Sequence, residues 1–251
     1  MTVTGERVTT PAGGFNPTWQ RHVAAYRLCA PLLGPGTVLD LGCGIGHSYA
    51  ELAPRRTVGV DVEASALAGQ ERETHVADMR ALPFPDASFA SVLSVHSIEH
   101  VPDPERVLDE VVRVLEPGGA AVFVTPNRLT FARPDEIIDP YHHVELDPRE
   151  LEALCAARFG GVEMHGLFGS DRYMELVDVQ RVALDRLLAR DPLRLRRLVP
   201  RRARQVLYDR MLTRARRDDD PRAAAIAPED FTLRSTGLDA CLDVVAACRA
   251  A

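Results

Sequence analysis

The chain has 251 residues, a formal net charge of −6 and 46% hydrophobic residues, which suits the core of one domain with an elaboration. The negative charge argues against a protein whose whole surface binds nucleic acid. The sequence contains no run of 18 or more apolar residues, so we expect no membrane-spanning helix. The first residues lack a signal-peptide pattern. The five cysteines show neither metal nor disulfide spacing, so we expect reduced thiols and a cytoplasmic location.

In chain order, residues 1–36 form an N-terminal segment whose helix begins at Asn16-Pro17-Thr18. An alternation of strands and helices follows. The predicted strands lie at 37–41, 57–61, 74–77, 89–95, 120–125 and 161–168, and the predicted helices at about 46–53, 64–69, 104–115 and 148–158. Asp147-Pro148-Arg149-Glu150 has the pattern of a capping box at the start of the last helix. The alternation favours a parallel sheet with helices on both faces, over residues 37–169.

The chain then departs from this alternation. Residues 170–228 are predicted to form a helical insertion, and the next predicted strand, 230–234, is followed by a predicted helix at 237–249. Residues 229–251 would thereby complete the core. A parallel strand at 161–168 ends at the edge where open α/β sheets bind ligands, so we expect the insertion to overhang the active site as a lid.

The most informative run extends from Val38 to His47, where an apolar strand leads into an acidic residue and a glycine-rich turn. Gly42, Gly44 and Gly46 can bring backbone N–H groups close to a ligand. A dinucleotide-binding turn would have its third glycine where His47 stands, and the chain has no lysine for a phosphate-binding loop. Asp40 instead suits a ligand with a cationic amino-acid end.

The run VLDLGCGIG (38–46) resembles the first motif of the class I S-adenosylmethionine-dependent methyltransferases, of the small-molecule, O-methyltransferase-like subgroup. Residues 58–67, 76–101 and 114–127 resemble the later motifs, in the same order and spacing. The resemblance implies a Rossmann-like, doubly wound, seven-stranded α/β sheet with an antiparallel last strand. It also implies S-adenosyl-L-methionine as cofactor and a small or medium-sized methyl acceptor.

The residues expected to hold this cofactor gather at strand ends. A carboxylate at Asp61 can accept hydrogen bonds from both ribose hydroxyls, with a helix N-cap as the alternative. By resemblance, Asp78 accepts from the adenine amino group and Met79 packs on the ring; a solvated loop acid is the alternative for Asp78. Arg21 could pair with the methionine carboxylate or be a solvated surface arginine. The candidate cofactor-binding residues are Arg21, Asp40, Gly42, Gly44, Gly46, Asp61, Val62, Asp78, Met79, Ser94 and Val95.

The loop after the fifth strand contains the run DPYHHVE (139–145), which resembles a segment of small-molecule O-methyltransferases. His142 and His143 are therefore the candidate catalytic residues, as general bases for a hydroxyl acceptor, with loop packing as the alternative. We expect no metal, because the adjacent side chains of these histidines diverge. His96 and His100 are compatible with a structural or a functional role. Oxygen is the first choice of acceptor atom, and nitrogen and carbon stay open.

Arginines crowd the end of the insertion. They are Arg190, Arg194, Arg196, Arg197, Arg201, Arg202, Arg204, Arg210, Arg214, Arg216 and Arg217. A solvated helix face or a partner for the acidic core is one interpretation; an anionic acceptor, a phosphate group or a membrane surface is the other. The alternatives to a small-molecule enzyme are thus a nucleic-acid methyltransferase, although the chain lacks an Asn-Pro-Pro-Tyr-type base-methylation motif, and a non-catalytic cofactor-binding module.

Overall fold

The computed structural model describes residues 16–131, 136–191, 194–206, 208 and 221–251. These residues form two compact units. The larger, here called the sheet unit, comprises 22–137, 142–168 and 232–251. The smaller, here called the helical unit, comprises the described residues of 1–21, 138–141 and 169–231.

A mixed sheet of eight strands has the order β3-β2-β1-β4-β5-β8-β6-β7. The strands are β1 (Val38–Leu41), β2 (Thr57–Asp61), β3 (Thr74–Val76), β4 (Phe89–Val95), β5 (Leu115–Pro126), β6 (Gly161–Gly169), β7 (Phe231–Arg234) and β8 (Asp243–Arg249). β1 pairs in parallel with β2 and β4, and β4 pairs in parallel with β5, whereas β8 is antiparallel to both β5 and β6. This is a Rossmann-like sheet with an antiparallel last strand, as the resemblance implied.

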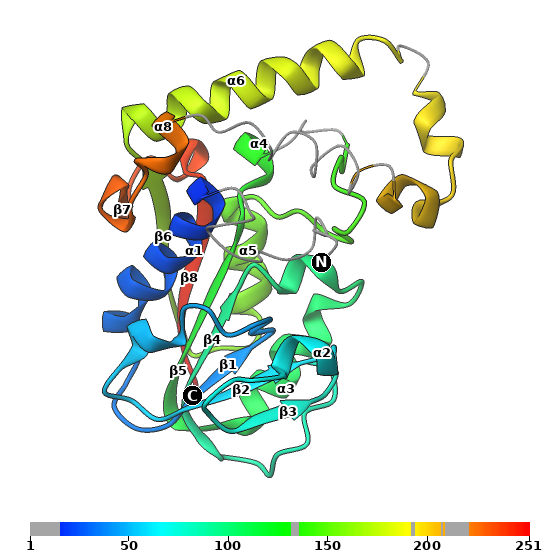
Figure 1. Cartoon of the computed structure of the whole chain (residues 1–251). Helices are drawn as coiled ribbons and strands as arrows, with labels where there is room; N and C mark the ends of the chain where they lie inside the picture. Colours follow the sequence, from blue (N-terminus) through cyan, green and yellow to red (C-terminus); the bar gives the residue numbers. More distant parts are fainter. Residues whose placement is uncertain (1–15, 132–135, 192–193, 207, 209–220) are drawn as a thin grey trace. The chain divides into compact units, whose positions relative to one another are not determined.

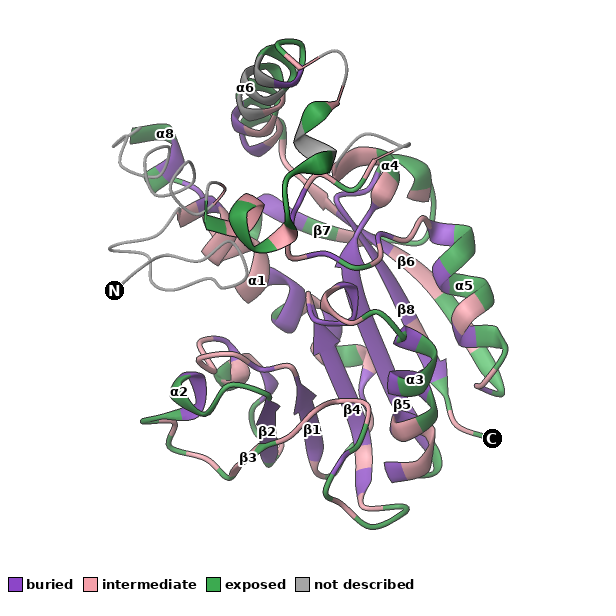
Figure 2. Ribbon diagram, turned by 90° about the vertical axis from the view of Figure 1, so that its right-hand side faces the viewer, coloured by how far each residue is buried: buried purple, intermediate pink, exposed green. Residues whose placement is uncertain are grey.

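Helices cover the sheet and bury its central strands, which are coloured as buried in Figure 2. α3 (Pro104–Val114) and α5 (Pro148–Ala156) lie along one face, where Leu108 and Leu151 share an apolar core with Phe123. The predicted capping box at the start of α5 is confirmed, because the Asp147 side chain accepts a 3.0 Å hydrogen bond from the Glu150 amide. On the opposite side of the strands, the second half of α1 (Asn16–Cys29) buries Ala25.

The remaining helices are short, with one exception. In the sheet unit they are α2 (Ala64–Leu67), α4 (Arg128–Phe131) and the 3-10 helices η1 (Ala30–Leu32), η2 (Tyr49–Leu52), η3 (Ile98–His100) and η6 (Leu238–Ala240). The helical unit contains the long α6 (Asp171–Leu188), then η4 (Leu195–Leu198), a helical stretch at 201–206, α8 (Pro221–Ala224) and η5 (Pro228–Asp230) (Figure 1). Residues 192–193, 207 and 209–220 of the predicted insertion lie outside the described residues, and so do Arg210, Arg214, Arg216 and Arg217.

The prediction of a helix at 237–249 is wrong, and the sheet has eight strands rather than seven. The strand predicted at 230–234 exists as β7, but it lies at the sheet edge. The antiparallel last strand is β8, in the middle of the sheet between β5 and β6. Val244, Val245 and Ala246 are all buried, so this interior strand has no polar face to produce an alternating pattern. A short apolar run of this kind cannot be distinguished from a buried helix by periodicity.

The helix predicted at about 46–53 is also shorter than expected. Only η2, a single turn of 3-10 helix, forms there, so the glycine turn is followed by an irregular segment rather than by a regular α-helix.

Candidate functional site

The glycine turn follows β1 and needs its three glycines for two different reasons. Gly42, Gly44 and Gly46 have φ values of +71°, +53° and +69°, which residues with a Cβ rarely adopt. A Cβ on Gly42 would also stand 2.4 Å from the Cβ of Ser97, whereas a Cβ on Gly44 would meet nothing within 4 Å. The turn is therefore packed against the protein at Gly42 and open at Gly44, as a cradle for a ligand requires.

Asp61, the last residue of β2, is bonded directly to this turn. One carboxylate oxygen accepts a 2.8 Å hydrogen bond from the Gly44 amide, and the other accepts a 2.9 Å hydrogen bond from the Glu63 amide. Acceptance of hydrogen bonds from ribose hydroxyls by this carboxylate stays a prediction. The next residue, Val62, is 67% exposed and presents an apolar side chain beside the turn.

Asp78 and Met79 lie in the loop after β3. The Arg80 guanidinium donates to the Asp78 carboxylate at 2.7 Å, and this hydrogen bond holds the pKa of Asp78 below its ordinary value. The Asp78 side chain is 41% exposed, so it remains accessible to a ligand. The Met79 methyl group reaches the glycine turn, 3.2 Å from the position of a Cβ on Gly42. The structure thus brings Met79 to the turn, and its packing on an adenine ring stays a prediction.

Asp40 has an environment that the sequence did not predict. Its carboxylate is fully buried and accepts a 2.7 Å hydrogen bond from the Tyr26 hydroxyl. It also lies 2.7 Å from a guanidinium nitrogen of Arg72, whose side chain is only 5% exposed. Burial raises the pKa of Asp40, while Arg72 and Tyr26 lower it. The contacts seen are with protein groups, so direct contact with a ligand's cationic end stays a prediction. The structure supports a role for Asp40 in fixing β1 under the glycine turn.

The end of β4 is joined to β1 through two serines. The hydroxyls of Ser94 and Ser97 lie 2.5 Å apart, and that of Ser97 donates to the Leu41 carbonyl at 3.1 Å. Val95 is buried. These contacts place the residues after β4 beside the residues after β1, at one edge of the sheet.

His96 follows directly and has a strained backbone, with φ of +49°. Its Nε2 lies 2.8 Å from an oxygen of Asp243, a fully buried carboxylate at the start of β8. The His96 ring also packs edge-on against the ring of His22 from α1, with centroids 4.4 Å apart. Sequence reasoning missed Asp243 because that part of the chain was predicted to be helical.

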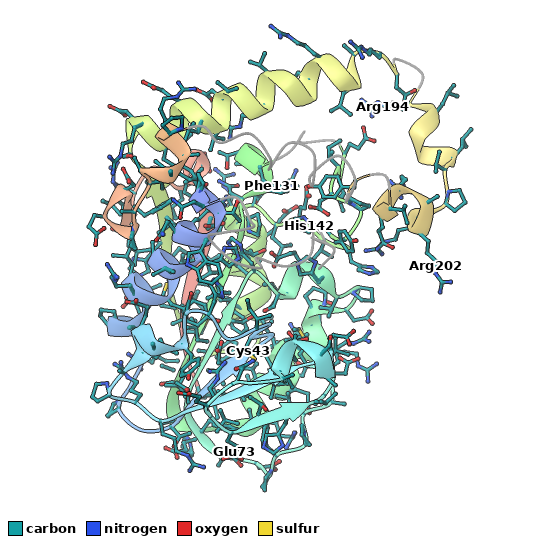
Figure 3. All side chains as sticks on the ribbon, in the orientation of Figure 1. Cys43, Glu73, Phe131, His142, Arg194 and Arg202 are labelled. Atoms are coloured by element: carbon teal, nitrogen blue, oxygen red, sulfur yellow. The ribbon has the colours of Figure 1, made fainter. Side chains whose placement is uncertain are left out.

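The two candidate bases, His142 and His143, have different environments. His142 is buried, and its Nδ1 lies 3.0 Å from an oxygen of Glu145. Its ring packs edge-on against that of His100 and lies beside that of Phe131 (Figure 3). His143 is exposed, and its amide donates to the Glu99 carbonyl at 2.7 Å. The divergence expected of adjacent side chains is therefore observed.

Comparison with known proteins gives the family. Residues 39–123 match the family described as "Methyltransferase domain". A probable S-adenosylmethionine-dependent methyltransferase of Mycobacterium tuberculosis strain H37Rv is 35% identical over 185 residues, which is 70% of this chain and 68% of that protein. The chain belongs to the S-adenosylmethionine-dependent methyltransferases. Its cofactor is accordingly S-adenosyl-L-methionine, and it is an enzyme of this class.

Two further comparisons concern a plant relative and a solved structure. The tocopherol O-methyltransferase of Arabidopsis thaliana is 34% identical over 124 residues, which is 44% of this chain and 36% of that protein. The crystal structure of a methyltransferase from Thermotoga maritima, described as a possible histamine N-methyltransferase, matches with a TM-score of 0.63 at 17% identity and covers 94% of this chain and 91% of its own. At that identity, the structural match shows the fold alone.

The helical unit holds the remaining candidates of the methyltransferase. Arg21 and the insertion 170–228 belong to this unit, and their predicted roles at the cofactor and as a lid stay predictions. Within the unit, the Arg201 guanidinium donates to the carbonyls of Pro140 and Tyr141 at 2.7 and 2.9 Å. This arginine therefore joins two segments of the helical unit. Arg202 is exposed and points outward (Figure 3). Among the helices of the described residues, none is long and apolar enough to cross a membrane.

Proposed function

We propose that this methyltransferase transfers the methyl group to an oxygen atom of a small or medium-sized molecule. The observation that carries the proposal is the contact between His96 and Asp243, which provides an oriented base at the end of β4. A hydroxyl is a poor nucleophile until it loses its proton, so a histidine backed by a buried carboxylate suits an oxygen acceptor. The O-methyltransferase name of the Arabidopsis relative agrees with this choice.

The residues around the glycine turn fit the cofactor. Gly44 leaves open space, the Asp61 carboxylate at the turn is of the type that accepts from ribose hydroxyls, and Met79 together with the exposed Val62 offers apolar surface for a base ring. S-adenosylmethionine supplies a methyl group on a cationic sulfur, which is already activated for transfer. The protein then has to orient the acceptor and exclude water.

The proton balance assigns a role to each member of the pair. As the acceptor oxygen bonds to the methyl carbon and the carbon–sulfur bond breaks, the hydroxyl proton passes to Nδ1 of His96. Asp243, on Nε2, stabilises the resulting imidazolium and holds the ring in place. His142, which Glu145 orients, and His143 stay candidates for the same role from the sequence.

Methyl-transfer assays with a panel of phenols, alcohols, carboxylates and amines, read out as S-adenosylhomocysteine formed, test this proposal. Asparagine tolerates a positive φ and cannot act as a base, so His96→Asn should keep cofactor affinity and lose about 10²–10⁴-fold in turnover. The loss should shrink for acceptors of lower pKa. His75→Ala, at a half-buried histidine on β3, is the matched control.

Two outcomes would contradict the proposal. Full turnover of His96→Asn at saturating acceptor would remove His96 as the base and return the role to His142 or His143. Methylation of amines alone would exclude the oxygen assignment. Salt-sensitive binding of a polynucleotide would instead favour a nucleic-acid acceptor that uses the arginine-rich insertion.

A further inference from the structure

Three potential metal ligands from two distant segments meet in the sheet unit. Glu99 and His100 belong to η3, just after β4, and His142 belongs to the loop before α5. One ligand atom of each lies within 4.8 Å of those of the other two. Backbone hydrogen bonds from the amides of His143 and Val144 to the Glu99 carbonyl, of 2.7 and 3.3 Å, hold the two segments together.

Glu99 is an unusual residue to find at this depth. It is 1% exposed, and only one of its carboxylate oxygens, Oε2, accepts a hydrogen bond, at 3.1 Å from the Thr125 hydroxyl. Among the described residues, its Oε1 has no hydrogen-bond partner. Burial of a polar atom without a partner costs free energy, and the rare cases in proteins call for a reason such as an ion.

His142 is positioned as metal-ligating histidines usually are. Its Nδ1 faces the buried carboxylate of Glu145 at 3.0 Å. A carboxylate behind a histidine fixes the ring orientation and raises the basicity of the other nitrogen. The His100 ring lies edge-on to that of His142, with centroids 5.2 Å apart.

We propose that Glu99, His100 and His142 bind one divalent transition-metal ion of the zinc type. Two imidazoles and one carboxylate match zinc or ferrous iron rather than magnesium or calcium, which prefer sites made of oxygen atoms. Ligand atoms of a tetrahedral zinc site are roughly 3.4 Å apart for bonds of about 2.1 Å, so small side-chain rotations would close the cluster around an ion.

The sequence argument against a metal considered only the adjacent histidines of this loop. The adjacent His142 and His143 cannot converge on one ion, and the structure confirms that they diverge. The other ligands come from η3, which the sequence places far from this loop. Three protein ligands leave a coordination position open, as in catalytic metal sites.

The open coordination position would allow the ion to bind the methyl acceptor. This catalytic role rests on the proposed function, whereas the metal site itself does not. An ion of the zinc type would lower the pKa of a hydroxyl bound to it. The acceptor oxygen would be held at the ion while its proton passes to His96 as the methyl group is transferred. Methyl transfer to that oxygen requires no oxidant or reductant.

Metal binding can be measured without turnover. Tag-free, full-length protein is stripped with a chelator and titrated with Zn²⁺ by calorimetry, with S-adenosylhomocysteine present; Co²⁺ gives a second readout by visible absorption. We expect one site in the parent. Glu99→Gln, which preserves size and the hydrogen bond to Thr125, should weaken binding more than about 100-fold, since loss of an outer partner alone costs about 10–100-fold. Glu145→Gln should fall within that smaller range.

The control is His143→Ala, which removes a neighbouring exposed histidine and should bind Zn²⁺ as the parent does. S-adenosylhomocysteine affinity serves as the test of folding for each variant, with His100→Ala as the second ligand variant if Glu99→Gln is unfolded. A parent without stoichiometric Zn²⁺, or ligand variants that bind like the parent, would overturn the site. Methyl transfer unaffected by removal of a bound ion would overturn its catalytic use, whereas a bound ion without transfer to any acceptor would contradict only the proposed function.

Discussion

Replacement of Arg72 by methionine tests a buried ion pair beneath the glycine turn. The Arg72 guanidinium and the Asp40 carboxylate are 2.7 Å apart, and both side chains are almost completely removed from water. Arg72→Met preserves much of the stem volume but leaves the carboxylate buried without its cation. Breaking a buried ion pair in this way costs about 3–5 kcal/mol. The lost stacking of the guanidinium on Tyr49, with 4.2 Å to the ring centroid, adds about 0.5–2 kcal/mol.

We therefore expect Arg72→Met to lose about 3.5–7 kcal/mol of unfolding free energy, which corresponds to roughly 7–28 °C in Tm for a chain of this size. Urea unfolding followed by circular dichroism measures the loss. The double variant Asp40→Asn/Arg72→Met removes both charges and should recover most of the stability.

The sign of the pH dependence provides a second measurement. Burial already raises the pKa of Asp40, and removal of Arg72 raises it further. A carboxyl with a raised folded-state pKa favours the folded state at low pH and loses this contribution as pH rises through that pKa. The deficit of Arg72→Met should thus be smaller at pH 5 than at pH 8. A deficit under 1 kcal/mol, or a double variant no more stable than Arg72→Met, would refute the reasoning.

Three further predictions concern the glycine turn and the core. Asp61→Ala should weaken S-adenosylhomocysteine binding by about 1.5–3 kcal/mol in calorimetry; unchanged affinity in a folded variant would remove Asp61 from the site. Burial lowers the pKa of His47 from 6.5 to about 4, so stability should fall by up to about 3 kcal/mol as pH drops through that window, and His47→Gln should flatten the curve. Burial raises the pKa of the Cys29 and Cys43 thiols to about 12, so neither should react with a thiol reagent at pH 8 until the protein unfolds; rapid labelling of the native protein would contradict this.

The features predicted correctly from sequence are those that depend on neighbouring residues. The glycine turn, the strand at Phe89–Val95 and the capping box at Asp147 each follow from a short run of the chain. Periodicity and turn chemistry are local properties, so a local reading recovers them.

The features missed are contacts between distant segments. The residues around Asp40 in the sequence do not predict Arg72 as its partner, and those around His142 do not predict Glu99 as its neighbour. Asp243 was missed twice, once as the partner of His96 and once as the start of a strand, because its surroundings are uniformly apolar. Pairings of this kind depend on register and packing across the whole sheet unit, which a single sequence does not reveal.

The place of β8 has a consequence for how the chain acquires its structure. β8 is the last strand in sequence but lies between β5 and β6 in the sheet. The hydrogen bonds that β5 and β6 make to β8 can therefore form only after the end of the chain is in place. Contacts between such distant segments slow folding, because loop closure costs entropy before the contacts repay it. Until β8 is placed, β5 and β6 each expose a strand edge of the kind that promotes aggregation. Before β8 pairs, a chaperone that binds extended apolar segments could bind these edges. The pairing of β8 with β5 and β6 would also bring Asp243 to His96.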